Sequence, residues 1–339
     1  MLFRSIDGSK FAAVNARDQN FNADKLKDLI ARADAHLADY LQQLDTADAA
    51  EPATAALSKT ELAAKIAVLQ ERQDWHKELL AQLDAEQKQV SVTDPDTRKM
   101  PTAHGTVVGY NAQLAVDAKH KLIAADDVTN EGTDLHQLAD IALQAKANLE
   151  IKQAEVLADA GYYNAAEVSR CTDNGLTPFI PKSDTSANTA RGLHGKSQFK
   201  YDAAKDGYVC PAGGTLTYRF STYELGRELK YYRAKGCQAC ALKGRCTRNK
   251  ANRTITREAN EHLMEAMAAR MQQHPEKFKL RKTLAEHPFG TIKRWFGYTH
   301  FLLKGLPKVQ CEWSLTTLAY NLKRVLNLVG FEQLMAAVA

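Results

Sequence analysis

Three stretches of this sequence place an acidic side chain where phosphodiester chemistry could use it. Asp7 lies in the strand-like run L-F-R-S-I-D-G-S-K-F, and Asp159 ends the apolar run V-L-A in V-L-A-D-A-G-Y-Y-N. Glu286 lies in a helical pattern, A-E-H-P-F-G-T-I-K-R-W. Cleavage of a nucleic-acid backbone commonly uses two divalent cations, and Mg²⁺ prefers oxygen ligands. We therefore take Asp7, Asp159 and Glu286 as candidate catalytic residues that bind Mg²⁺.

Each acid also has a structural interpretation that the sequence leaves open. Asp159 could cap the turn or helix that follows it, and Asp7 could begin an Asp-Gly turn if the strand ends before it. Glu286 could form an exposed ion pair with Lys282, worth only about 0.3–0.5 kcal/mol. Such a pair does not explain why aromatic and basic residues alternate after Glu286, a pattern that suits stacking on bases and contact with phosphates.

The charge of the chain supports contact with a polyanion. The net charge of the 339 residues is +5, but residues 1–170 hold 18 basic and 27 acidic residues, whereas residues 171–339 hold 27 and 13. The two halves therefore carry −9 and +14, an asymmetry that is typical of nucleic-acid-binding chains as well as of dipolar soluble proteins. The candidate DNA-binding residues cluster around Glu286: Arg281, Lys282, Lys293, Arg294 and Trp295.

Four of the six cysteines are spaced like metal ligands. Cys237-x2-Cys240-x5-Cys246 lies downstream of Cys210-Pro-Ala-Gly, and four thiolates from two loops can close a tetrahedral Zn²⁺ site. A second cysteine beside Cys210 is missing, so plain reduced cysteines are the alternative. The other two, Cys171 and Cys311, lie in helical patterns and are expected to be packing residues.

The surrounding pattern predicts an α/β fold that brings the acids together. We expect a strand over residues 2–15, a helical hairpin over 22–83, and antiparallel strands at 106–116 and 122–128. A helix at 134–149, a strand at 154–158, a helix after Asn164 and a strand at 178–180 complete a βαβ pattern. Two antiparallel strands followed by βαβ suit a ribonuclease-H-like mixed sheet flanked by helices.

The same pattern divides the chain into four parts. Residues 1–20 and 91–182 are expected to form the catalytic core, and residues 21–90 a helical hairpin insertion. Residues 183–256, rich in Gly, Ser, Thr, Tyr and Cys, are expected to form a cysteine-containing insertion. Residues 257–339 are expected to supply C-terminal helices that complete the core.

Several motifs taken together resemble an insertion-sequence transposase. They are D-G-S-K-F, T-D-P-D-T-R-K-M, G-Y-N-A-Q-L-A-V-D-A-K-H-K-L-I, L-A-D-A-G-Y-Y-N, E-H-P-F-G-T-I-K-R-W and L-A-Y-N-L-K-R-V. Across nearly the whole chain, the sequence is similar to the IS4/IS5-like DDE superfamily, and within it to the IS1182 type. The resemblance implies a ribonuclease-H-like catalytic domain, two Mg²⁺ ions (with Mn²⁺ as a substitute), and cut-and-paste strand transfer at terminal inverted repeats.

The resemblance also assigns residues. The second and third acids of the family triad fall on Asp159 and Glu286, and the Lys seven residues after the Glu is Lys293. Lys282 stands at the motif's Arg and Lys279 at its Tyr, which departs from the pattern. Asp7 is the expected first acid, and Asp94 in T-D-P-D-T is the competing choice.

The resemblance further implies double-stranded DNA as partner, both terminal repeats and target, and a homodimer. Family members usually carry an N-terminal DNA-binding region that is expected to be missing here. The alternatives are therefore a catalytically inactive DNA-binding remnant and a host-adopted nuclease. No run of about 18 apolar residues and no secretion signal is evident. The expected location is the bacterial cytoplasm, in association with the nucleoid when DNA is bound.

Overall fold

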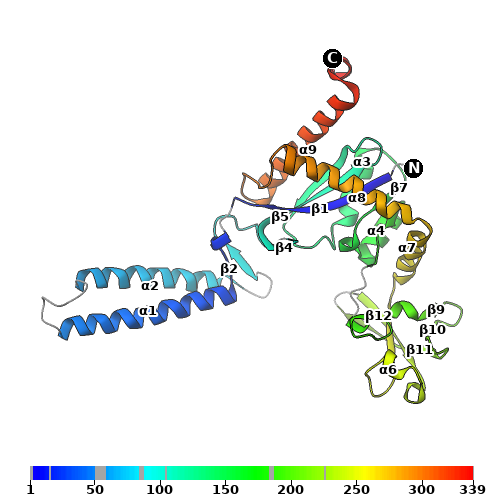
Figure 1. The fold of residues 1–339 in the computed structure, drawn as a ribbon, viewed down its shortest axis with the longest axis horizontal. Coiled ribbons are helices and arrows are strands. Elements are labelled where there is room, and N and C mark those ends of the chain that lie inside the picture. Colours follow the sequence, from blue (N-terminus) through cyan, green and yellow to red (C-terminus); the bar gives the residue numbers. More distant parts are fainter. Residues whose placement is uncertain are drawn as a thin grey trace.

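The structure is a computed structural model that describes residues 3–14, 17–49, 59–83, 88–103, 105–182, 187–224 and 227–338. A mixed sheet with helices on both faces forms the centre of the molecule. A helical hairpin, a second sheet and the last helix extend from this centre in different directions (Figure 1).

The central sheet has the strand order β4-β5-β1-β7-β8, with β6 also paired to β5. β1 is antiparallel to β5 and parallel to β7, which is parallel to β8. β4 and β6 are antiparallel to β5. The mixed α/β sheet predicted from the sequence is confirmed. Its strands are β1 (Phe3–Ala12), β4 (Arg98–Thr102), β5 (Gly105–Asp117), β6 (Ile123–Thr129), β7 (Ala154–Leu157) and β8 (Leu176–Phe179).

Alternation along β1 feeds two separate cores. Ile6 packs on one face of the sheet, together with residues of α3, α4 and α7. Phe11 packs on the opposite face, against α8, the π-helix η5 and α9. Side chains one strand position apart point to opposite faces, so odd-numbered residues of β1 face α8. The helices are α3 (Leu138–Asn148), α4 (Ala165–Asp173), α7 (Glu261–Gln273), α8 (Pro275–Gly290), η5 (Thr291–Trp295), α9 (Leu306–Val329) and α10 (Phe331–Val338).

The core under α8 and α9 is aromatic. The Phe11 ring centroid lies 5.0 Å from that of Trp313, 5.7 Å from that of Phe301 and 5.9 Å from that of Tyr298. Tilted and edge-to-face ring pairs at these distances contribute about 0.5–1.5 kcal/mol beyond the area that they bury. This cluster fixes β1 to the helices that approach it.

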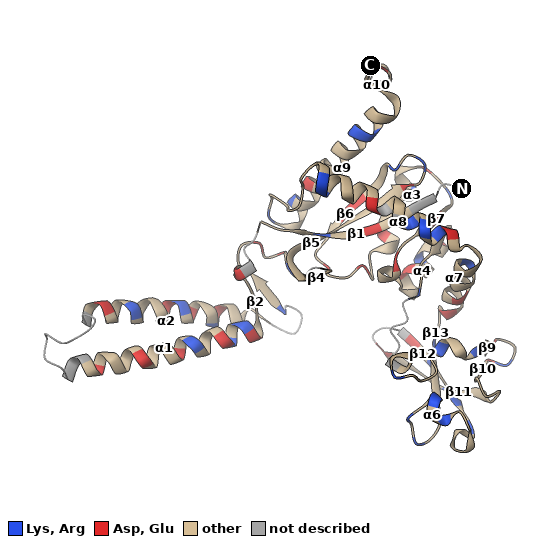
Figure 2. Ribbon diagram, in the orientation of Figure 1, with Lys and Arg blue, Asp and Glu red and all other residues tan. Residues whose placement is uncertain are grey.

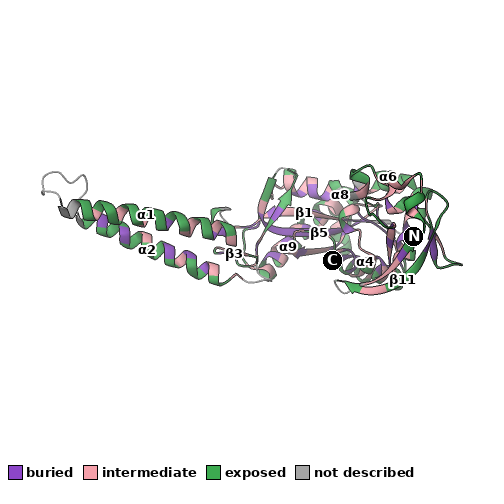
Figure 3. Ribbon diagram, turned by 90° about the horizontal axis from the view of Figure 1, so that it is seen from below, coloured by how far each residue is buried: buried purple, intermediate pink, exposed green. Residues whose placement is uncertain are grey.

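A long helical hairpin projects from the sheet (Figure 1). At its base β2 (Asn20–Asn22) pairs with β3 (Gln89–Ser91), after the short helix η1 (Arg17–Gln19). The hairpin helices are α1 (Ala23–Ala49) and α2 (Lys59–Ala81). The buried cluster Phe21, Leu26, Leu79 and Val90 joins them at this base, while the outer faces are largely exposed (Figure 3).

The second sheet is five-stranded and antiparallel, in the order β13-β12-β11-β10-β9. Its small core contains Tyr208, Leu216, Tyr232 and Ile255. Arg257 joins it to α7 through Glu265, with nitrogen–oxygen distances of 2.6 and 2.8 Å. Its elements and the other short helices are η2 (Ala160–Tyr162), α5 (Ala187–Ala190), η3 (Lys196–Gln198), β9 (Lys200–Asp202), β10 (Gly207–Val209), β11 (Thr215–Glu224), β12 (Arg227–Ala234), η4 (Cys237–Ala239), α6 (Lys243–Cys246) and β13 (Thr254–Glu258).

In the part of the chain that the structure describes, no helix combines the length and the apolar character needed to cross a membrane.

The aromatic core gives a first test. We expect Phe11→Ala to lower the free energy of unfolding by about 3–5 kcal/mol, because Phe11 is 1% exposed and its removal leaves a cavity among rings. Phe331→Ala is the control, since Phe331 is 68% exposed and its loss should change stability by less than about 0.5 kcal/mol. Urea unfolding measures the free energy of unfolding of both variants. Equal losses in the two variants would contradict the proposed packing of Phe11 in the aromatic core.

Candidate active site

Asp7 and Asp159 come from neighbouring parallel strands at matching positions. β1 pairs with β7 over residues 3–5, where Ser5 lies opposite Leu157. Two residues further on, β1 reaches Asp7 and the chain leaving β7 reaches Asp159. The two acids are therefore side by side where β7 ends and one edge of β1 becomes open. In open α/β sheets, ligands bind in the crevice at the carboxyl ends of the strands.

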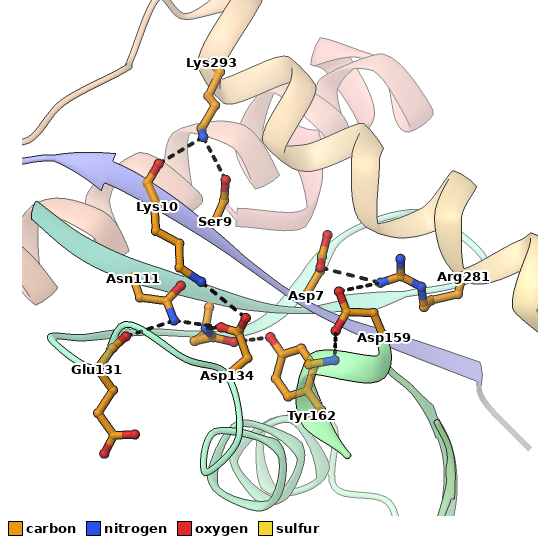
Figure 4. A network of polar contacts seen from close by, with 12 residues as sticks. Asp7, Ser9, Lys10, Asn111, Glu131, Asp134, Asp159, Tyr162, Arg281 and Lys293 are labelled. Atoms are coloured by element: carbon orange, nitrogen blue, oxygen red, sulfur yellow. Dashed lines mark hydrogen bonds and ion pairs between the residues drawn. The ribbon is translucent and has the colours of Figure 1, made fainter. Parts of the chain in front are cut away.

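Arg281 on α8 places a positive charge between these acids (Figure 4). Its Nη1 lies 3.5 Å from Asp7 Oδ1 and 3.9 Å from Asp159 Oδ2. The Arg281 and Asp7 side chains are 15% and 20% exposed, and the Asp159 side chain is 41% exposed. Among the described residues, Arg281 Nε and Nη1 are buried without a hydrogen-bond partner. The contact is therefore Coulombic, and lacks the paired hydrogen bonds of a bidentate Arg–carboxylate pair.

The surroundings of Asp7 disfavour its charged form. Burial raises the pKa of Asp7 from 3.8 to about 6, and the nearby Asp159 and Asp134 carboxylates add to the rise. Arg281 and the Gly8 amide oppose it. Gathering like charges in a partly desolvated crevice has this effect, and a cation placed there relieves it.

Asp159 has a structural contact as well as a place in the crevice. Its Oδ1 accepts a hydrogen bond from the Gly161 amide at 2.8 Å and so caps η2. The capping interpretation of this residue is confirmed, and its catalytic role stays a prediction. Because Oδ1 is engaged, Oδ2 is the oxygen nearer to Arg281.

A third acid, Asp134, was missed by the sequence analysis. Its Oδ1 accepts from Asn111 Nδ2 at 2.7 Å and Gln113 Nε2 at 2.8 Å, and its Oδ2 pairs with Lys10 Nζ at 3.3 Å (Figure 4). Two polar residues in an otherwise apolar strand, Asn111 and Gln113, were the available signal. The full set of partners identifies Asp134 as a residue that positions the crevice wall.

Close packing around Asp134 extends to β1 and η2. The buried Tyr162 hydroxyl donates to Gln113 Oε1, and burial raises the pKa of Tyr162 well above its ordinary value. A Cβ at Gly8 would lie 2.4 Å from Gln113 Nε2 and 2.6 Å from Asp134 Oδ1, which leaves room only for glycine. The Asp-Gly pair in β1 thus serves the packing of this wall, and β1 continues through it to Ala12.

α8 carries both Arg281, which contacts the two aspartates, and Glu286. Five residues separate the two, which is about 140° around an α-helix. Glu286 is exposed and lines a surface hollow together with Arg281, Lys121, Lys279 and Thr283. The contacts of Arg281 bring Asp7 and Asp159 together around one cationic group. The role of Glu286 as the third catalytic acid stays a prediction.

The other predicted DNA-binding residues differ in their surroundings. Lys293 Nζ donates to Ser9 Oγ at 2.7 Å and to the Lys10 carbonyl at 3.1 Å, and lies 4.4 Å from the Phe11 ring centroid. Burial lowers the pKa of Lys293. Arg294 is exposed and Trp295 is 80% exposed, so both are open to a partner. The side chain of Lys282 lies outside what the structure describes.

Asp94, the competing first acid, occupies a different place. It is fully buried, with Oδ2 accepting from the Tyr110 hydroxyl at 2.8 Å and Oδ1 from the Gly305 amide at 3.2 Å. These bonds attach its loop to β5 and to the start of α9. Asp7 therefore stands beside Asp159, and Asp94 does not.

The four predicted cysteine ligands line one pocket of the second sheet module, and all six cysteines are free thiols. Cys171 is buried in the core as expected, whereas Cys311 is exposed. The packing prediction for Cys311 was wrong because its position on α9 faces outward. Within the described ranges, no group of three or more His, Cys, Asp or Glu side chains stands ready to hold a metal ion.

Comparison with known proteins gives one family match. A protein-family model described as "Transposase DDE domain" matches residues 209–326, which include Glu286 and the four clustered cysteines but neither Asp7 nor Asp159. No curated protein matches the chain. The cryo-EM structure of the piggyBac transposase synaptic complex with hairpin DNA matches with 11% identity and a TM-score of 0.28. That match covers 66% of this chain and 42% of that chain, and a likeness so weak carries no argument.

The raised pKa of Asp7 predicts a stability that depends on pH. Neutral Asp7 favours the folded state below about pH 4, and this contribution is lost as the pH rises through about 6. We expect Asp7→Asn to raise the free energy of unfolding at pH 8 by about 2 kcal/mol, because one pKa unit corresponds to about 1.4 kcal/mol and Arg281 loses a partner. The gain should vanish toward pH 4. Urea unfolding across this range measures it, with the exposed Asp173→Asn as control.

Asp94 should behave as a structural residue. We expect Asp94→Asn to lower the free energy of unfolding by about 1–3 kcal/mol, because it weakens two buried hydrogen bonds to a charged acceptor. The pH dependence that Asp7 produces should stay as in the wild type. An Asp94 variant that is as stable as the wild type, measured by the same urea series, would argue against this assignment.

Proposed function

We propose that this chain is the catalytic part of an insertion-sequence DNA transposase of the DDE type. The observation that carries the proposal is the pair of carboxylates, Asp7 and Asp159, with a cationic group held between them. The family match to residues 209–326 supports the same class independently, because it covers a different part of the chain.

The order of the strands supports a ribonuclease-H-like core. β5 is antiparallel to β1, and β6 is antiparallel to β5. β7 and β8 then extend the other side of β1 in parallel, joined by α4. A ribonuclease-H-like core combines antiparallel strands with a βαβ unit in this way, and the combination places two acids at one crevice.

The residues present fit divalent cations as cofactors. Arg281 stands where a cation between Asp7 and Asp159 would stand, and burial together with the nearby carboxylates raises the pKa of Asp7 despite Arg281. Asp7 and Asp159 would hold Mg²⁺, or Mn²⁺ in its place, with Glu286 as the proposed third ligand. Divalent cations held by these residues would supply the activation of a water or 3′-hydroxyl and the stabilisation of the leaving oxygen.

A rotation of α8 about its own axis would bring Glu286 toward the aspartates, because Glu286 lies about 140° around the helix from Arg281. The same rotation would withdraw Arg281 from the pair, because both residues lie on this helix at different angles. Arg281 therefore balances the acids in the arrangement seen here, and Glu286 replaces that contact in the arrangement competent for cleavage.

The predicted DNA-binding residues of η5 differ in their proposed roles. Exposed Arg294 would contact a phosphate of double-stranded DNA, and exposed Trp295 would stack on a base. Basic residues lie along α8 (Figure 2), which packs with η5 on the same face of the central sheet. Lys293 instead fastens η5 to β1 through Ser9 and so positions the strand that carries Asp7.

A cleavage assay tests the proposal. We expect the full chain, with Mg²⁺ or Mn²⁺, to nick labelled duplexes taken from the repeats that flank its gene and to join the freed 3′ ends to target DNA. Asp7→Asn, Asp159→Asn and Glu286→Gln should each lower the cleavage rate at least about 100-fold, because each removes a proposed metal ligand. Asp173→Asn is the matched acidic control and should cleave like the wild type.

Three outcomes would overturn the proposal in different ways. Tight binding of the repeats without nicking in either metal would identify an inactive DNA-binding remnant. Nicking without strand joining would identify a nuclease. Nicking that persists in the Asp159 variant would show that the crevice is not the catalytic centre.

A further inference from the structure

The second sheet module carries four cysteine thiols around one pocket. Cys210 directly follows β10. Cys237 is the first residue of η4, and Cys240 follows its last residue. Cys246 is the last residue of α6. All four line a pocket of about 30 Å³, a volume that suits a single ion. Segments about 30 residues apart in the chain thus contribute cysteines to the lining of one pocket.

The backbone around these thiols is shaped to present sulfur. The Gly214 amide donates to Cys210 Sγ at 3.2 Å, and the Gly213 amide donates to the Cys210 carbonyl at 2.9 Å. Gly213 has a φ of +79° and Gly236, just before Cys237, a φ of +74°, so both turns need glycine. An amide that donates to sulfur stabilises a thiolate, as hydrogen bonds to other metal ligands do.

The four thiols share their pocket with the basic side chains of Lys243 and Arg253. Four thiolates gathered around one pocket would repel each other unless a cation joined them. His194 lines the same pocket, and its Nε2 is buried without a hydrogen-bond partner among the described residues.

We propose that Cys210, Cys237, Cys240 and Cys246 bind one structural Zn²⁺ ion. The described side chains do not stand at ligand spacing in this metal-free arrangement, so binding has to draw the sulfurs inward. Each thiol loses its proton to solvent as its Zn–S bond forms, and no electron is transferred. Four thiolates complete a closed tetrahedral site, which is the form that structural zinc takes.

Zinc at this place would close one end of the second sheet. The ion would tie the turn after β10 to the segment between β12 and β13, beside a core of only a few large side chains. Basic residues flank the same segment: Lys235, Lys243, Arg245, Arg248 and Lys250. The metal would therefore hold a basic surface in shape, independently of the acids of the central sheet.

Metal content of the full chain tests the proposal. We measure zinc by inductively coupled plasma mass spectrometry of protein purified from zinc-supplemented cells. We expect about one Zn²⁺ per wild-type chain, and less than a fifth of that in the Cys246→Ser variant. Cys311→Ser is the matched control, since Cys311 is exposed, and should keep the full zinc content. His194→Ala should also keep it, because the four thiols complete the coordination.

A second measurement needs no variant and so does not depend on the folding of Cys246→Ser. In the wild type, a chelator should raise the reaction rate of four thiols with a disulfide reagent at least about tenfold, and added Zn²⁺ should restore the slow rate. The proposal would be overturned if the wild-type protein contained no zinc and its four thiols reacted equally fast with and without the chelator. Neither measurement uses DNA cleavage, so failure here would leave the transposase proposal untouched.

Discussion

The repulsion between carboxylates that share a partly buried crevice is the constraint on which the rest of this structure depends. Asp7 and Asp159 meet where β7 ends, and Asp134 lies close enough to raise the pKa of Asp7. A fold keeps such an arrangement only when positive charge offsets it, and Arg281 and Lys10 supply that charge. The arrangement reduces the stability of the protein, a cost that is common at functional sites.

The elements around the crevice serve to hold these charges in place. The aromatic cluster of Phe11 and Trp313 packs β1 against the helices, and Lys293 ties η5 to Ser9, two residues from Asp7. Gly8 lets the Asp134 network approach β1 on the opposite side. A strand fixed from both faces positions a carboxylate more rigidly than a loop does, which is what metal chemistry needs.

Much of this could be predicted from the sequence, because it rests on local patterns. Apolar alternation predicted β1, β5 and β6, and an acid after a short apolar run predicted the position of Asp159 at a strand end. Asp134 was missed because its importance comes from Asn111 and Gln113, whose side chains meet it only in the folded sheet. The orientation of Glu286 depends on how α8 turns against β1, and a helical pattern with polar residues on several sides does not determine that angle. Asp94 was the competing choice in sequence, yet its buried carboxylate bonds to the Gly305 amide just before α9.

The most direct test of the account is a crystal structure of the full chain soaked with Mn²⁺ and recorded at a wavelength where manganese scatters anomalously. The account predicts an anomalous peak within bonding distance of oxygens of both Asp7 and Asp159, with the Arg281 guanidinium displaced from between them. Manganese bound elsewhere, or an Arg281 that stays between the two carboxylates at saturating Mn²⁺, would contradict it.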